Sequence, residues 1–201
     1  MFLLLGWLLS FPFLAAGPQQ LPPLLVVVDA GHGGEDPGAV VAGVREKDIV
    51  LDIVHRVFEL ARGGPVEVVL TRATDRYVDL VERVRFAEEV GATLYLSVHA
   101  NYLSDPRVRG IEVWVDNTRA RGDPSWALAQ AVLEALVRET GAADRGVRSQ
   151  KLYLRHTKLP AALVEVGYLS NPTDRRLLLD PDYRARLAKG ILEGIYAFLG
   201  L

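Results

Sequence analysis

The stretches VVVDAGHGG (residues 26–34), LYLSVHAN (residues 94–101) and AALVEVGYLSN (residues 161–171) determine the fold that we predict for this chain. Each contains a run of apolar residues, and buried parallel strands typically have such runs. Each run also leads to a residue that can bind a metal or carry a proton: these are His32, His99 and Glu165. In open α/β sheets the reactive crevice lies outside the carboxyl ends of the strands. We therefore expect the three residues to meet at one sheet edge, where two imidazoles and a carboxylate indicate a hydrolytic zinc site.

Strand-like and helix-like segments alternate along the rest of the chain. Strands are predicted at residues 25–29, 66–71, 94–99, 111–115, 152–154 and 162–165. Helices are predicted at residues 48–61, 79–91, 125–141, 171–179 and from residue 180 onward. Asp79 and Ser125 are the expected caps of the second and third helices. The alternation predicts an α/β fold, a single layered domain with a mostly parallel or mixed sheet of about six strands and helices on both faces.

Composition restricts both the partners and the metal ligands. The chain has 201 residues, of which 50% are hydrophobic, enough for one packed domain. The formal net charge of -2 gives no basic excess, so no nucleic-acid partner is expected. The sequence contains no cysteine, so a metal site must use His, Asp or Glu side chains.

The first residues differ from the rest of the chain. An apolar stretch at residues 2–16 ends in small residues and is shorter than the roughly 20 residues that span a bilayer. We expect residues 1–17 to form a signal peptide, or else an N-terminal anchor, although no Lys or Arg precedes the apolar stretch. Residues 18–23 are then a linker and residues 24–201 the folded domain, with no stable membrane span once the leader is removed.

Each of the three site residues also has a structural interpretation. His32 lies among glycines that allow close approach of backbone to a metal or a substrate, but ordinary turns contain the same pattern. His99 could be a core histidine with both ring nitrogens hydrogen-bonded. Glu165 lies in an apolar run, where burial either requires a partner such as an arginine or raises the carboxyl pKa. A carboxyl group with a raised pKa suits the proton carrier of a hydrolase.

A catalytic zinc site needs a third protein ligand, and position alone leaves five candidates for it. They are Asp29, Glu35, Asp36, Glu46 and Asp48. Glu46 lies just before a predicted helix, where a carboxylate also suits the helix dipole. We expect His55 to lie on a solvated helix face and His156 to lie in a loop, where it could line a cleft. Arg72 and Arg83 are expected to form structural ion pairs.

The ordered motifs of the chain resemble one known family. They are DAGHGG (29–34), DPGA (36–39), REKD (45–48), LTR (70–72), SVHAN (97–101), DRGV (144–147) and VEVGYLSN (164–171). The chain resembles the zinc-dependent N-acetylmuramoyl-L-alanine amidases, the amidase-3 type of bacterial cell-wall hydrolase. The resemblance implies that residues 24–201 are an amidase catalytic domain. It also implies site roles: zinc ligands His32, Glu46 and His99, and a catalytic Glu165.

The resemblance implies a function, namely zinc-dependent hydrolysis of the amide bond between N-acetylmuramic acid and L-alanine in peptidoglycan. Such an enzyme acts in cell-wall remodelling or daughter-cell separation and is exported to the periplasm, the cell wall or the extracellular space. Arginines near the cleft would dock free carboxylates of the stem peptide, and the candidates are Arg145, Arg148 and Arg155. Some members insert an autoinhibitory helix where this chain has only residues 116–124, which implies a permanently open site.

Two departures and two alternatives accompany this resemblance. Ala30 replaces the proline more usual in the family, and the cell-wall-binding repeats that members often carry are missing from the sequence. A zinc peptidase that cuts within the stem peptide could use the same ligands. A wall-binding module without activity is a third interpretation, but a binder has no need of a buried proton carrier. The sequence identifies no protein activator.

Overall fold

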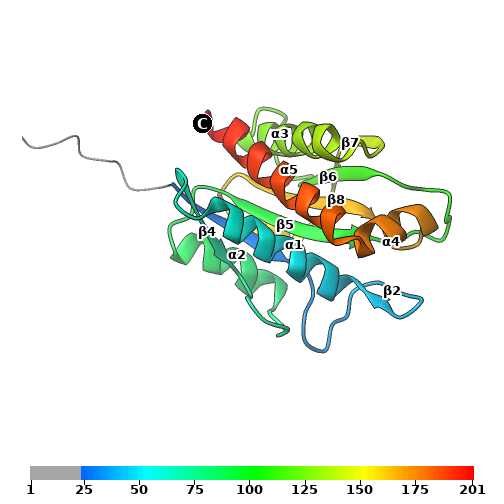
Figure 1. The fold of residues 1–201 in the computed structure, drawn as a ribbon. Helices are drawn as coiled ribbons and strands as arrows, with labels where there is room; N and C mark the ends of the chain where they lie inside the picture. The colour runs from blue at the N-terminus through cyan, green and yellow to red at the C-terminus, as the bar shows by residue number, and fades with distance from the viewer. Residues whose placement is uncertain (1–23) are drawn as a thin grey trace, which may run out of the picture.

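The computed structural model describes residues 24–201, in which helices pack on both faces of a six-stranded mixed sheet (Figure 1). The strands are β1 (Leu24–Ala30), β2 (Val40–Val41), β3 (Val44–Arg45), β4 (Val66–Leu70), β5 (Tyr95–Asn101), β6 (Ile111–Asp116), β7 (Asp144–Gln150) and β8 (Ala161–Tyr168). The helices are α1 (Glu46–Ala61), α2 (Leu80–Glu89), α3 (Pro124–Thr140), the short 3-10 helix η1 (Tyr153–His156), α4 (Pro172–Leu179) and α5 (Pro181–Leu199). The predicted α/β fold is confirmed. The signal peptide or anchor (1–17) and the linker (18–23) lie outside the described residues.

The strand order places the three motif-bearing strands beside one another. The main sheet has the order β4-β1-β5-β8-β6-β7, and β2 pairs only with β3. Neighbours from β4 to β8 run parallel, whereas β6 is antiparallel to β8 and parallel to β7. The carboxyl ends of β1, β5 and β8 therefore lie at one edge of the sheet, and β6 begins at that edge.

The core lies on both faces of the sheet because successive side chains of a strand point to opposite faces. Val26 and Val28 of β1 belong to the larger cluster, which also contains residues of α1, α3 and α5. Val27, between them, belongs to a smaller cluster with residues of α2 and η1. Buried on both faces, β1 needs a continuous apolar run, which is why its sequence shows no alternation.

Two helix boundaries differ from the prediction. α1 begins at Glu46, two residues earlier than expected, so Glu46 belongs to the first helical turn. Asp123 caps α3 by accepting a hydrogen bond from Ser125 N, with Pro124 at the first helical position, so the predicted Ser125 cap is wrong. Asp79 caps α2 as predicted. Among residues 24–201, no helix combines the length and the apolar character needed to cross a bilayer.

The strand at the β7 side of the sheet also differs from the prediction. The predicted strand at residues 152–154 is wrong, because this segment enters the 3-10 helix η1. The sixth strand is instead β7, whose sequence DRGVRSQ is polar and mostly exposed or half-buried. β7 has a strand neighbour on one side only, so it does not need the apolar pattern by which a buried strand is found.

Candidate metal centre

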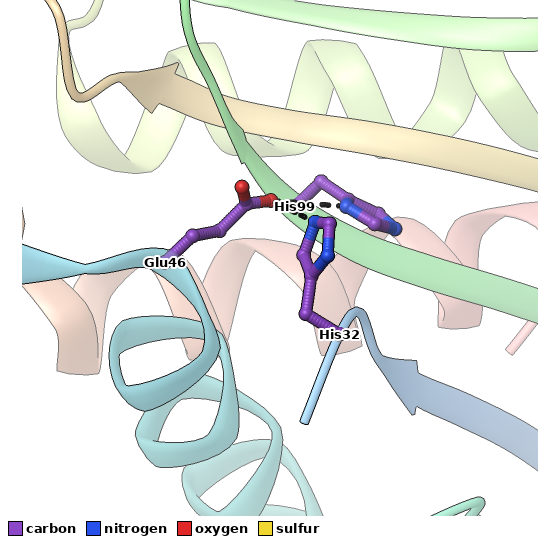
Figure 2. A group of neighbouring side chains, drawn as sticks. All are labelled: His32, Glu46 and His99. Atoms are coloured by element: carbon purple, nitrogen blue, oxygen red, sulfur yellow. Dashed lines mark hydrogen bonds and ion pairs between the residues drawn. The ribbon is translucent and has the colours of Figure 1, made fainter. Parts of the chain in front are cut away.

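Three side chains from distant parts of the sequence meet at the carboxyl edge of the sheet (Figure 2). His32 follows β1, Glu46 is the first residue of α1, and His99 lies near the end of β5. One ligand atom from each lies within 4.8 Å of the other two, and no second cluster of this kind occurs among residues 24–201. The structure thus brings together the three residues that the resemblance implied as metal ligands.

Glycine and a left-handed backbone make room for the two imidazoles. His32 has φ 60, a conformation that non-glycine residues rarely adopt, so the loop after β1 is locally strained. A Cβ atom at Gly31 would lie 2.2 Å from His99 Cε1 and 2.5 Å from His99 Nε2. Only glycine at position 31 therefore allows the His99 ring to lie against the backbone beside His32, and the two ring centroids are 4.9 Å apart.

The Glu46 carboxylate connects the two histidines. Its Oε1 lies 3.1 Å from His32 Nε2 and 3.0 Å from His99 Nδ1. The same carboxylate accepts hydrogen bonds from two backbone amides, Ala100 N at 3.0 Å and Ala39 N at 2.9 Å. Burial raises the pKa of Glu46, but its hydrogen bonds and charge interactions with His32 and His99 outweigh burial and leave the pKa far below its usual range. Glu46 is therefore ionised at neutral pH, the state that a metal ligand requires.

The two histidines have different partners. His32 Nδ1 lies 2.7 Å from Asp36 Oδ2, so a carboxylate fixes the orientation of this ring, as is common for metal-binding histidines. His99 Nε2 is buried and has no hydrogen-bond partner among the described residues. Because core histidines normally satisfy both ring nitrogens, the core-histidine interpretation does not account for His99.

Glu165 lies beside this cluster in β8. It is the register partner of His99 in the neighbouring parallel strand. Its Oε2 is buried without a hydrogen-bond partner among residues 24–201. Burial, together with the nearby charges of Glu46 and Glu112, raises the pKa of Glu165 well above its usual value. Glu165 and all three cluster residues line one pocket of about 460 Å³, with Ala39, Val40, Asn101 and Tyr102 completing its wall.

The other candidates for a third ligand have structural roles. Asp29 is fully buried and accepts hydrogen bonds from Thr71, Ser97 Oγ at 2.7 Å and Arg83 Nη1 at 2.8 Å. Asp36 orients His32 as described above. The remaining two lie on the surface: they are Glu35 and Asp48. Asp48 pairs with Arg45 at 2.6 Å, so Glu46 is the carboxylate that the fold turns toward the histidines.

Two buried arginines lie beneath the His32 loop. Arg83 forms the predicted structural ion pair, here with Asp29, and also donates to His32 O at 2.7 Å. Arg72 differs from the prediction, because its hydrogen-bond partners are backbone carbonyls such as Gly31 O at 2.8 Å. Both side chains thus fix the backbone that presents His32. His55 is exposed on α1, as expected. His156 is the last residue of the 3-10 helix η1, so its predicted loop is wrong, and it does not line this pocket.

The three arginines proposed to bind substrate fall into two groups. Arg145 Nε and Arg148 Nε lie 3.3 Å and 3.2 Å from Glu112 Oε2, at the sheet edge that carries Glu165. Arg155 pairs instead with Asp116 at 3.3 Å. Asp116 ends β6, which runs antiparallel to β8, so Arg155 lies at the opposite edge of the sheet, away from the pocket.

Glu112 is a buried acid at this site that was not among the predicted site residues. This residue is 2% exposed and is the register partner of Glu165 in the antiparallel strand β6. The signal was present, since Glu112 interrupts the apolar run IEVWV in the way that Glu165 interrupts its own. A carboxylate inside an apolar strand therefore marked a residue of interest in both places, although only Glu112 has partners among the described residues.

The fold and the cluster define a class of protein, an α/β domain with a His/Glu/His centre at the carboxyl ends of its parallel strands. The chain belongs to the Amidase_3 family, N-acetylmuramoyl-L-alanine amidase, which it matches over residues 26–197. It is 36% identical to the endolysin of Bacillus phage SPP1 over 88% of this chain and 66% of that protein. It is 33% identical to the N-acetylmuramoyl-L-alanine amidase LytC of Bacillus subtilis (strain 168), over 86% of this chain and 35% of LytC.

A solved structure shows the same architecture. The catalytic domain of CwlV, an N-acetylmuramoyl-L-alanine amidase from Bacillus (Paenibacillus) polymyxa var. colistinus, superposes with a TM-score of 0.82 at 37% identity. The match covers 88% of this chain and 98% of that domain. The chain thus corresponds to nearly a whole catalytic domain, but to only about a third of LytC.

Proposed function

We propose that this chain is a zinc-dependent N-acetylmuramoyl-L-alanine amidase that cleaves the amide bond between N-acetylmuramic acid and L-alanine in peptidoglycan. The observation that carries the proposal is the pairing of a His/Glu/His cluster with a buried, unpartnered carboxyl group in one pocket. Family membership and relatives such as LytC and CwlV, which are N-acetylmuramoyl-L-alanine amidases, support the choice of bond.

The donor set fits zinc. Two imidazoles and one carboxylate are a ligand set that catalytic zinc sites use, with a further position left for water or substrate. His32 Nε2 and His99 Nδ1 both face the ionised Glu46 carboxylate, and such a convergence of two imidazole nitrogens and one negative charge suits a cation. When bound by His32, Glu46 and His99, zinc supplies a Lewis acid that lowers the pKa of water and stabilises negative charge on the substrate carbonyl oxygen.

Glu165 is the proposed proton carrier. Burial and the charges of Glu46 and Glu112 raise the pKa of this carboxyl group, which suits a group that takes up a proton and gives it back. As general base it accepts the proton of the attacking water, and as general acid it returns that proton to the departing amine of L-alanine. Because its Oε2 has no competing hydrogen bond among residues 24–201, this oxygen is free for the transfer.

The test is digestion of purified peptidoglycan by the zinc-loaded protein, with mass spectrometry of the soluble products. Release of intact stem peptides with a free L-alanine amine supports the amidase. Fragments cut within the stem peptide would favour the zinc peptidase, and binding without release would favour the wall-binding module. Metal analysis of the purified protein and of His32→Ala and His99→Ala variants tests the ligand assignment, since both variants are expected to lose zinc.

The pocket is proposed to be open without an activator. The segment before α3 lies at the end of the sheet opposite the pocket. Arg119 in this segment donates to the carbonyls of Leu154, Thr157 and Leu159, which precede β8. This segment therefore does not cover Glu165. We expect the purified chain to digest peptidoglycan without a partner protein. Activity that appears only after a partner is added would contradict the open site.

The proposed site of action is outside the cytoplasm, in the periplasm or the cell wall. A peptidoglycan substrate requires export, which agrees with the sequence-based expectation of a leader at residues 1–17. The proposed biological role is cell-wall remodelling or daughter-cell separation. Fractionation of cells that express the full chain, with N-terminal sequencing of the mature protein, distinguishes a cleaved leader from a retained anchor.

A further inference from the structure

Glu112 is a buried carboxylate that the proposed chemistry does not use. It lies opposite Glu165 in the antiparallel pair of β6 and β8. Both of its oxygens are occupied: Oε1 accepts from Asn101 Nδ2 at 3.0 Å and Trp114 Nε1 at 3.2 Å, and Oε2 faces two arginines. A carboxylate so fully paired is not free to act as a base, so Glu112 has the character of a fixed acceptor.

The two arginines are held by only one end of their guanidinium groups. Arg145 Nε donates to Glu112 and, at 3.1 Å, to the Tyr168 hydroxyl. Arg148 Nε pairs with Glu112 and donates to Arg145 O at 3.3 Å. The terminal Nη atoms of both side chains make no hydrogen bond to any residue within 24–201. Orientation is therefore fixed through Nε, while the paired N–H donors that bind carboxylates stay free.

The charge at this position favours an anion. Two guanidinium groups share one Glu112 carboxylate, which leaves one positive charge in excess. Arg145 and Arg148 are 24% and 43% exposed at their side chains, so a ligand can reach both. The nearest acidic residue in β7, Asp144, turns its carboxylate toward Gly146 N at 2.8 Å and does not pair with either arginine.

The position of Arg145 and Arg148 in the sheet sets how far a peptide must extend from the pocket to contact them. β7 is separated from β8 by β6 alone, and neighbouring strands lie about 4.8 Å apart, so β7 lies roughly 10 Å from β8. An extended peptide covers about 3.3 Å per residue. A peptide that leaves the pocket across β6 would thus bring its second or third residue to the arginines.

We propose that Arg145 and Arg148, fixed by Glu112, form a subsite for a free carboxylate of the stem peptide on the leaving-amine side of the cleaved bond. This subsite rests on the proposed amidase function, since it assumes that the peptide lies on this side of Glu165. The subsite would select one class of substrate: stem peptides with a free, unamidated carboxylate two or three residues from the cleaved amide bond. Arg155, at the opposite sheet edge, has no part in it.

The test compares two substrates that differ only in that charge. One is an N-acetylmuramoyl peptide with free carboxylates, and the other is the same compound with those carboxylates converted to amides. For the zinc-loaded enzyme, Arg148→Gln is expected to raise KM about tenfold on the first substrate, the value of one charge-assisted hydrogen bond, and less than about twofold on the second. Arg148→Lys, which keeps the charge but loses the planar fork, is expected to fall between.

A matched control and a second readout complete the design. Arg62→Gln removes one positive charge from a side chain that is 69% exposed at the end of α1. It should leave the KM for both substrates unchanged. Binding of the two released stem peptides, followed by calorimetry, reports the subsite without turnover. Equal changes on both substrates, or no preference for the carboxylate peptide in either assay, would overturn the subsite. Absence of hydrolysis with the binding preference intact would instead count against the amidase function.

If Arg148→Gln lowers the unfolding temperature, Arg145→Gln and the calorimetric comparison provide an independent test. Arg145 lies over the Tyr168 ring, 5.2 Å from the ring centroid, and Arg148 lies 5.8 Å from that of Trp114. Each variant therefore removes one guanidinium and leaves the other on its own aromatic neighbour. Loss of carboxylate preference in both variants supports the subsite, and loss in neither contradicts it.

Discussion

Two buried acids in neighbouring parts of one sheet have opposite environments. Asp29 near the end of β1 accepts hydrogen bonds from Thr71, Ser97 and Arg83, so its charge is fully paired. Glu165 near the end of β8 keeps a buried oxygen without a partner among the described residues. Burial raises the pKa of both; Arg83 and the hydroxyl groups reverse this for Asp29, whose pKa is lowered, whereas the charges of Glu46 and Glu112 add to it for Glu165. Folding thus satisfies one acid completely and leaves the other available for chemistry.

The largest expected effect is on the unpaired acid. Glu165→Gln should lower amide hydrolysis about 10²- to 10⁴-fold, because an amide cannot carry the proton. The unfolding temperature should not fall, since the variant removes a buried carboxyl oxygen that has no partner. Release of stem peptides and thermal unfolding measure the two quantities. Glu67→Gln, on the exposed surface of β4, is the matched control, and near-normal turnover by Glu165→Gln would refute the assigned role.

The paired acid should give the reverse result. Asp29→Ala leaves Arg83 buried without its counter-ion and should cost about 3–5 kcal/mol of the free energy of unfolding. Urea unfolding measures this loss. Asp48→Ala, which removes an exposed ion pair with Arg45, should cost less than about 1 kcal/mol. Equal losses for the two variants would mean that Asp29 does not have the structural role assigned to it.

Zinc should stabilise the folded chain by binding to His32, Glu46 and His99 beside the unpaired Glu165. At a free zinc concentration about 1,000 times Kd, the free energy of unfolding should rise by about 4 kcal/mol. His99→Ala should abolish this gain, whereas His55→Ala, whose ring contacts Ala73 O at 3.0 Å away from the pocket, should keep it. Thermal unfolding with added zinc and with a chelator gives both values. A zinc-independent unfolding temperature in the unmodified chain would exclude the site.

The smallest effect is the acid dependence contributed by Asp29. Its pKa is lowered in the folded state, so its stabilisation is complete above the unfolded pKa of about 3.9 and is lost as pH falls through the lower folded value. Asp29→Asn should therefore lose stability less steeply than the unmodified chain below about pH 4. Urea midpoints from neutral to acidic pH measure the slopes. Parallel slopes would show that Asp29 titrates alike in both states.

The sequence predicted the buried half of the fold well because burial on both faces demands continuous apolar runs. β1, β5 and β8 have such runs, and their ends identified His32, His99 and Glu165. β7 was missed because an edge strand with polar residues carries no such pattern. The 3-10 helix η1 was mistaken for a strand because three residues are too few to distinguish the two periodicities.

The site shows a similar limit. Periodicity placed two histidines and Glu165 at one edge but left five carboxylates for the third ligand, since these acids lie in and around the irregular segment between β1 and α1. Only the helix start at Glu46 turns that carboxylate toward both rings, and this boundary lay two residues from the predicted one. The pairing of Glu112 with Glu165 depended on the reversed direction of β6, which no local pattern specifies.

The polar edge strand β7 has a consequence for self-association. An uncovered strand offers its free N–H and C=O groups to any other strand, and charged side chains discourage such edge-to-edge contacts between copies. Arg145 and Arg148 lie on that rim, so the residues proposed to attract a carboxylate would also repel an identical neighbour. Replacing both by apolar side chains would remove a barrier to aggregation, which makes this rim a poor place to engineer tighter substrate contacts with hydrophobic residues.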